Sequence, residues 1–552
     1  MIFLRITLLF FCSTFLVQNI DCQNITPADA GALSGNLQAN GNFYIRDSTI
    51  GAANIPQYDR QLVGADAWLT LNYNRAGYDI GVRFDLFNNS QLLNPRESYS
   101  ANGIGRFYLK KRIHDLTIYG GYIYDQIGSG IIYRSYEDRP LGVDNALVGI
   151  NLDYQLGELG HIKAFSGRQK QQFDLYKSTI NGLNTEGFFT VKNMTLAPGL
   201  GIVHRTLDDE TVNQVVSALA TYTRADSIGA KYNTFATTFY NTLSAGKWTW
   251  YVEAAYKTAE AIFDPNAVKV NRDGTLTEGK FTNRSGSVIY SNLSFATEVG
   301  NPETSWGVGI TLEAKRTDGF TFRTTPFAVL NRGIINFLPP MSRQNSYRLT
   351  TRYVPATQEL GEQGIQLDIK LAPKENINFD INISNITTLK NTLLYREIYA
   401  SCLFKKEKTD LTIGLQLQTY NQQIYEVKPQ VPNVQTVTPF IELRKKLNEK
   451  KSLKLELQYM NTQQDYGSWL YGGVELSIAP KWSFSATDMW NIVPKKTAKA
   501  LHYPSVSVAF SHESNRITFG YVKQVEGVVC TGGICRLEPA FSGVKLAVAS
   551  AF

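Results

Sequence analysis

The chain has 552 residues, a net charge of +7 at neutral pH, 19% charged residues and 12% aromatic residues. A soluble chain of this length would divide into roughly three or four domains, yet no proline- or glycine-rich linker separates any. The modest charge gives no case for a dedicated nucleic-acid-binding protein, which concentrates basic residues on one face. Composition therefore favours a large, polar, aromatic-rich β protein.

The N-terminus has the pattern of a secretory signal peptide. Arg5 precedes an apolar run from Ile6 to Val17, which is too short to span a membrane as a helix. We expect a signal peptide over residues 1–22, with cleavage near Cys22. Lipidation of Cys22 is an alternative, although Asn19-Ile20-Asp21 lacks the small and apolar residues that such a site requires. The exported mature chain is then 23–552.

The rest of the chain is dominated by strands in which apolar and polar residues alternate. In the segment 453–459, leucines and a tyrosine occupy one face, while lysine, glutamate and glutamine occupy the other. The same alternation occurs in segments 248–256, 365–371, 377–383 and 411–420. This period of two is typical of strands with one apolar side and is incompatible with a helix.

Short and long connections alternate between these strands. Long connections are expected around 47–63, 88–103, 125–145, 258–284, 317–364, 421–434, 491–502 and 524–540. From Leu33 to Phe552 the alternation predicts about 24 strands, within a range of 20–26. A short helix is expected within 208–222, and the segment from Tyr347 to Val354 has the pattern of a further strand.

These strands favour a transmembrane barrel over a soluble sandwich or propeller, which also alternate polar and apolar residues. No repeat of blade length occurs, and six aromatic residues near predicted strand ends fit interfacial girdles: Trp68, Tyr73, Tyr78, Trp248, Trp482 and Trp490. In lipid, strands must close on themselves. We predict an all-β protein, a single large antiparallel β-barrel of the bacterial outer membrane, with long extracellular loops and short periplasmic turns.

The last strand alternates and ends at Phe552, which is typical of the C-terminal signal of outer-membrane barrels. We therefore expect barrel-assembly machinery and outer-membrane lipid as partners, with other outer-membrane proteins or lipoproteins as further candidates and no nucleic acid.

Three cysteines remain in the mature chain. Cys530 and Cys535 flank Thr-Gly-Gly-Ile, a tight loop that suits a local disulfide. A metal pair is the alternative, but no second cysteine pair or histidine cluster lies nearby to complete four ligands. Cys402 lies in an alternating strand, where a small apolar filler is expected.

The chain resembles an uncharacterised family of Bacteroidota outer-membrane β-barrel proteins. The resemblance covers nearly all of the mature chain and is most specific in segments 33–41, 125–149 and 527–552. It implies an outer-membrane barrel from that bacterial group. It implies no activity, because none is established for the family.

No motif supports catalysis. The string from Gly274 to Lys280 has the spacing of a phosphate-binding loop, but Phe281 stands where a serine or threonine is required. The five histidines are dispersed without metal-ligand spacing. A serine hydrolase in a barrel wall is an open alternative, because a catalytic triad need not be close in sequence, but no observation supports it. We expect no enzyme activity and no cofactor.

The long connection from Asp125 to Asp144 carries the most distinctive charges: Arg134, Glu137, Asp138, Arg139 and Asp144. One interpretation is a solvated surface loop. The other is a constriction or plug inside the lumen, where charged groups select solutes. Two functions follow: a pore for polar solutes or, alternatively, a structural or docking subunit of an outer-membrane assembly or secretion complex.

Overall fold

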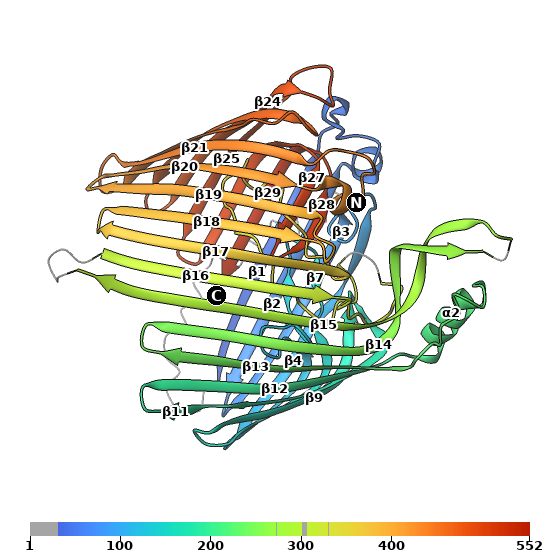
Figure 1. The fold of residues 1–552 in the computed structure, drawn as a ribbon. Coiled ribbons are helices and arrows are strands. Elements are labelled where there is room, and N and C mark those ends of the chain that lie inside the picture. The colour runs from blue at the N-terminus through green and yellow to red at the C-terminus, as the bar shows by residue number, and fades with distance from the viewer. Residues whose placement is uncertain (1–30, 272, 301–305, 329–330) are drawn as a thin grey trace.

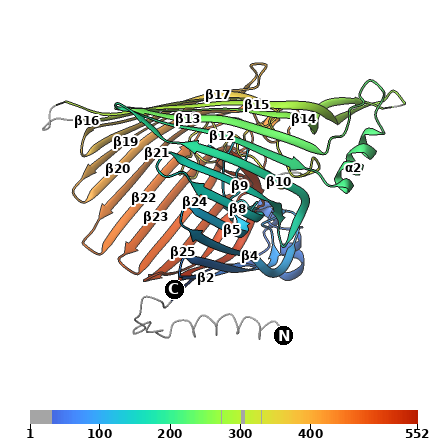
Figure 2. The same cartoon turned by 90° about the horizontal axis from the view of Figure 1, so that it is seen from below.

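The computed structural model describes residues 31–271, 273–300, 306–328 and 331–552 and forms one closed barrel (Figures 1 and 2). Each wall strand pairs antiparallel with its neighbours in the chain, and β1 (Ala32–Tyr44) pairs with β29 (Phe541–Ala551) to close the ring. The predicted signal peptide lies outside the described residues. No helix in the described ranges is long and apolar enough to cross a membrane.

The barrel contains 24 wall strands within the described chain, as the alternation predicts. β10 and β11 both pair with β12 and together form one of them. Between β1 and β29, the wall consists of β2 (Val63–Arg75), β3 (Tyr78–Ser90), β4 (Tyr99–Ile113), β5 (Leu116–Ile123), β8 (Leu147–Gln155), β9 (Gly160–Gln171), β10 (Asp174–Gly187), β11 (Phe189–Val191), β12 (Met194–Thr206), β13 (Asn233–Ala245), β14 (Trp248–Val270), β15 (Leu276–Val299), β16 (Trp306–Asp318), β17 (Gly361–Lys374), β18 (Ile377–Thr387), β19 (Leu393–Lys406), β20 (Thr409–Tyr420), β21 (Val434–Lys446), β22 (Lys451–Met460), β23 (Gly467–Ile478), β24 (Trp482–Pro494), β25 (His502–His512) and β26 (Asn515–Gln524).

The connections contain the remaining elements of the described chain. These are η1 (Ser48–Ile50), η2 (Gln57–Gln61), β6 (Glu137–Asp138), β7 (Val143–Asp144), α2 (Asp209–Leu219), α3 (Gln422–Tyr425), β27 (Gly527–Thr531) and β28 (Ile534–Glu538).

The two faces of the wall differ as a barrel in lipid requires. Leu200 on β12 and Phe239 on β13 point outward and are 58% and 55% exposed, and the alternate positions face the lumen. Glu253 and Lys257 on β14 are inward-facing and fully buried. Because strand side chains alternate, one face can contact lipid while the other is polar. The fold is therefore a transmembrane β-barrel.

The two ends of the barrel also differ. At one end, called here the short-turn end, two to six residues join consecutive strands, as between β2 and β3 or β19 and β20. At the other, the long-loop end, connections reach 319–360. The predicted alternation is confirmed, and the helix expected within 208–222 is α2, whose N-terminus is capped by Asp208 through the backbone N–H of Thr211.

The expectation of a long connection at 258–284 is wrong. β14 and β15 instead continue as strands of 23 and 24 residues, and their hairpin projects beyond the wall beside α2 (Figures 1 and 2). Two register irregularities interrupt their pairing, after Lys257 and after Asp264. The irregularities disrupt the period of two, which explains why the sequence pattern indicates a loop here.

Two further expectations need correction. Tyr347–Val354 forms no strand and lies in the connection between β16 and β17, because a closed wall offers no free edge for it to join. Trp68 lies in the interior of β2, points into the lumen and is only 4% exposed, so it belongs to no girdle. Trp248 and Trp482 do lie exposed at the first positions of β14 and β24.

Candidate functional site: a plug inside the lumen

Three long connections fold inward and contact one another inside the barrel. We call segments 124–146, 319–360 and 525–540 the plug. The backbone N–H of Arg134 donates to the carbonyl of Ile335 at 2.8 Å, which joins the first segment to the second. The N–H of Thr357 donates to the carbonyl of Gly533 at 3.0 Å, which joins the second to the third. The plug is therefore one structure rather than three separate loops.

The centre of the plug is apolar. Ile127, Ile131 and Ile132 of the first segment are fully buried, as are Phe320 and Phe322 of the second, and they belong to one hydrophobic cluster with inward-facing wall residues. Burying each such side chain contributes about 1.5–3 kcal/mol. The wall accommodates this cluster by using glycine at position 201, where a Cβ atom would collide with the Ile127 side chain.

Acidic residues of the plug form ion pairs with buried cations of the wall, chiefly with Arg83. This arginine on β3 is 2% exposed and donates to the Glu137 carboxylate at 2.8 Å and to Asp144 at 3.1 Å. It also pairs with its strand neighbour Asp85 at 2.6 Å. Lys170 on β9 pairs with Asp144 at 2.5 Å. Two acidic residues of the connection are thus held by two buried cations of the wall.

Electrostatics at Asp144 follow from this arrangement. Burial alone would raise the pKa of its carboxyl, but the charges of Lys170 and Arg83 outweigh burial and hold that pKa below its ordinary value. The Tyr124 hydroxyl donates a further hydrogen bond to Asp144 at 2.8 Å. Asp144 is therefore ionised at neutral pH and keeps its ion pairs.

The other three charges selected from the sequence have different surroundings. Arg139 donates to Gln38 of β1 at 2.7 Å and lies 4.9 Å from the Trp68 ring, so it also contacts the wall. Asp138 accepts from the backbone N–H of Leu141 and stabilises the local turn. The Arg134 guanidinium lies 4.1 Å from the Phe337 ring, within the plug.

Sequence reasoning missed further ties between the first plug segment and the wall. Glu253 accepts from the backbone N–H of Ser129 at 2.9 Å and from its hydroxyl at 2.6 Å. Lys163 pairs with Asp125 at 2.7 Å. Glu253 and Lys163 occupy inward positions of alternating strands, which is a usable signal for lumenal residues. The pattern does not reveal which connection each one contacts.

The second plug segment is tied to the opposite part of the wall. Arg343 pairs with Asp380 of β18 at 2.7 Å and lies 3.9 Å from the Tyr399 ring. Asn345 donates to Glu397 of β19 at 2.7 Å, and Gln458 of β22 accepts from the backbone N–H of Leu349 at 2.7 Å. None of these residues stood out in the sequence, because 317–364 carries no compact group of charges.

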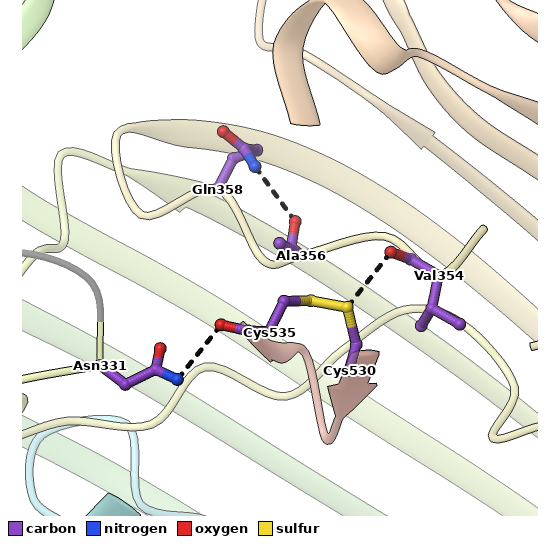
Figure 3. Close-up of a disulfide and its surroundings, with 6 residues drawn as sticks. All are labelled: Asn331, Val354, Ala356, Gln358, Cys530 and Cys535. Carbon is purple, nitrogen blue, oxygen red and sulfur yellow. Dashed lines mark hydrogen bonds between the residues drawn. A yellow bond between two sulfur atoms is a disulfide. The ribbon is translucent and has the colours of Figure 1, made fainter. Parts of the chain in front are cut away.

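The third plug segment is the hairpin of β27 and β28, and it contains the predicted disulfide. Cys530 and Cys535 are directly opposite in the hairpin and are bonded, with Cα atoms 4.0 Å apart (Figure 3). Asn331 donates to the carbonyl of Cys535 at 3.1 Å, and the Cys530 sulfur lies 3.4 Å from the carbonyl oxygen of Val354 (Figure 3). The disulfide prediction is confirmed, and the bond closes a hairpin that faces the second plug segment.

The remaining sequence candidates lie in the wall. Phe552 exchanges backbone hydrogen bonds with Gly35 at 2.7 and 2.9 Å, so the last residue takes part in closing the ring. Cys402 is a free thiol on β19 opposite Phe379 and Ile413. In the described part of the chain, no group of three or more His, Cys, Asp or Glu side chains is arranged to hold a metal ion.

Comparison with known proteins identifies the family. Residues 2–552 match a family of unknown function, DUF6029. The chain belongs to this family. No curated protein matches it.

Three solved structures similar to this DUF6029 member differ widely in their names. The first is the translocation pore of the P pilus usher PapC, with 8% identity, a TM-score of 0.35 and coverage of 95% of this chain and 99% of that chain. The second is the ferric-catecholate import receptor Fiu from E. coli K12, with 9% identity, a TM-score of 0.39 and coverage of 96% of this chain and 82% of that chain. The third is a BenF-like porin from Pseudomonas fluorescens Pf-5, with 8% identity, a TM-score of 0.34 and coverage of 95% of this chain and 98% of that chain. At this level of similarity they carry no conclusion about function.

Proposed function

We propose that this DUF6029 protein is a restricted pore for small polar solutes in the bacterial outer membrane, and that the plug forms its constriction. The observation that carries the proposal is the attachment of the plug to the lumenal wall by charged pairs, chiefly at Arg83. A barrel of about two dozen strands has a lumen wide enough to conduct or to require internal filling. Here the protein's own connections supply that filling.

The lumen towards the short-turn end supports passage of polar solutes. Inward-facing residues there, such as Lys370, Glu456 and Thr487, keep contact with solvent. The lining carries both signs of charge, as in pores where charged side chains govern solute selection. A solute that passes the plug thus enters a polar, hydrated half of the lumen.

Deleting residues 128–142 tests the proposal. Removal of this part of the plug is expected to raise the single-channel conductance in a planar bilayer several-fold, because the constriction widens. The matched control replaces 209–222, around α2 outside the wall, with a Gly-Ser linker and leaves conductance unchanged. Heat-modifiable mobility on a gel verifies that both variants form barrels. Equal conductance of the wild type and the deletion variant contradicts the proposal.

One observation favours the alternative, a structural or docking subunit of an outer-membrane complex. The projecting hairpin of β14 and β15 exposes apolar residues beyond the wall, including Val268, Val270 and Leu276, the last being 70% exposed. Such apolar exposure in water is typical of contact surfaces. Pull-down from mild detergent separates the two functions. A stoichiometric partner that is lost when 264–280 is shortened favours docking, whereas a lone conducting barrel favours the pore.

A further inference from the structure

A cavity of about 680 Å³ lies between the plug and the wall at the long-loop end. The cavity is lined by the hairpin of β27 and β28, by wall loops around Tyr425 and Asp465, and by plug residues Arg348, Thr351, Arg352 and Tyr353. Pockets that bind small molecules typically enclose about 300–1,000 Å³. Solvent reaches the interior of this one, because the Arg348 side chain at its lining is exposed.

Part of the charge around the cavity is internally balanced. Lys428 pairs with Glu426 and lies 3.5 Å from Asp465. Lys496 pairs with Asp465 as well. These two lysines and two acids therefore cancel, and the other charged residues determine the character of the cavity.

The remaining cations form no ion pairs. Among the described residues, no carboxylate lies within the 4.0 Å of an ion pair from Arg348, Arg352, Arg536 or Lys545. Arg352 stacks 4.4 Å from the Trp469 ring, and its Nε atom is buried without a hydrogen-bond partner. Arg536 borders an adjoining cavity of about 390 Å³ on the same hairpin, and its Nε atom is likewise buried and unpartnered.

These cations lie close enough to act on one another. Lys545 interacts electrostatically with Arg348 and with Arg536. The surrounding protein partly desolvates Arg348, although its side chain keeps contact with solvent, and this desolvation together with the positive charge of Arg352 lowers the pKa of Arg348. An arginine stays protonated in a protein even so, and the group therefore keeps its charge. Glu526 and Glu538 also line the cavity and offset part of this charge, and the Glu538 carboxylate accepts from Gln524 at 2.5 Å.

We infer that this cavity binds a small anionic solute through its phosphate or carboxylate group, with Arg348 and Arg352 as donors. Guanidinium groups match the oxygens of phosphate and carboxylate in geometry and charge. A bound anion would relieve the repulsion among the cations, and the cavity has room for a sugar-sized molecule. The inference rests on the proposed pore only for the passage of the solute, since binding needs no conduction.

Binding is tested on the purified full-length barrel in detergent, by titration calorimetry and by the fluorescence of its tryptophans, which include Trp469 beside Arg352. The probes are glucose 6-phosphate, glucuronate and glucose. We expect the charged probes to bind and glucose to fail, with binding that weakens as salt is added. Binding of glucose 6-phosphate alone identifies phosphate as the group that is recognised, and binding of glucuronate alone identifies carboxylate.

The deciding variant is Arg348→Gln, which removes a side chain that reaches solvent and makes no hydrogen bond or ion pair in the described structure. It is expected to weaken binding of the charged probe roughly tenfold, as the loss of a charge-assisted hydrogen bond implies. The matched control is Arg112→Gln, at the short-turn end, which removes the same charge and leaves affinity unchanged. Failure of both charged probes, equal binding of glucose, or an unaffected Arg348→Gln variant overturns the inference.

Conductance separates this inference from the proposed pore. If the barrel conducts but binds neither charged probe, the cavity is no anion site and the pore still stands. If it binds a charged probe but conducts neither as wild type nor after deletion of 128–142, the pore fails and the site stands. In a conducting barrel under a KCl gradient, we expect Arg348→Glu to shift the reversal potential towards potassium selectivity.

Discussion

In the wall, backbone N–H and C=O groups of neighbouring strands satisfy one another around the ring, and the pairing of β1 with β29 leaves no free edge. The plug has two-stranded pieces only, β6 with β7 and β27 with β28, and its attachment to the wall depends on side chains such as Arg83, Glu253 and Gln458. Wall and plug thus occupy the same barrel but are stabilised by different groups.

Because of this difference, the plug can be altered without unfolding the wall. A wall strand cannot separate from its neighbours inside lipid without leaving backbone polar groups unpaired, which costs several kcal/mol for each unsatisfied group. A plug segment is released when a few side-chain ties break, because the backbone pairing of the wall does not depend on it. Variants that affect one region and spare the other test this separation.

The largest effect is expected from Arg83→Ala. Loss of the guanidinium leaves Asp85, Glu137 and Asp144 with one fewer cation in a buried site, and breaking such a pair costs about 3–5 kcal/mol. Hydrogen exchange should accelerate in 124–146 and stay slow in the wall strands. Arg75→Ala, at an exposed turn, is the control. Equal acceleration in the plug and in the wall would show that the two regions are not separate.

A charge placed on the lipid-facing side is expected to destabilise the wall rather than the plug. Phe239→Arg puts a cation on the outer face of β13 and should destabilise the barrel by about 2–4 kcal/mol if it lies near the bilayer midplane. Thr242→Arg, on the inward face of the same strand, should cost much less because it points into the lumen. Denaturant titration in lipid vesicles measures both. The prediction is contradicted if Thr242→Arg lowers the stability of the barrel more than Phe239→Arg does.

The smallest effect is expected from the double substitution Cys530→Ser and Cys535→Ser. Opening a loop of six residues costs about 2 kcal/mol in the chain-entropy account of disulfides. Hydrogen exchange should increase in 527–538, and the denaturation midpoint of the wall should not move. A single Cys402→Ser variant, which removes a free thiol from the wall, is the control. A lowered wall midpoint in the double variant would show that the hairpin supports the ring.

The wall could be predicted closely because its signal is local. Alternation along each strand decides which residues face lipid, and the strand count, the short turns and the helix at α2 follow from residues near one another in the chain. Where irregular pairing interrupts the period, after Lys257 and Asp264, the prediction failed. Trp68 was misplaced for a related reason, because aromatic character alone does not reveal which face of a strand is occupied.

The sequence alone determined that apolar and polar residues alternate along the strands and that 125–144 carries unusual charge, and it predicted about 24 strands and a disulfide between Cys530 and Cys535. Only the tertiary structure decided that this connection meets Arg83 and Lys170, that 319–360 shares the lumen with it, and that Arg348 and Arg352 line a cavity without forming ion pairs. The physical reason is that strand periodicity is a property of neighbouring residues, whereas closure of the ring determines which distant side chains face one another across the lumen.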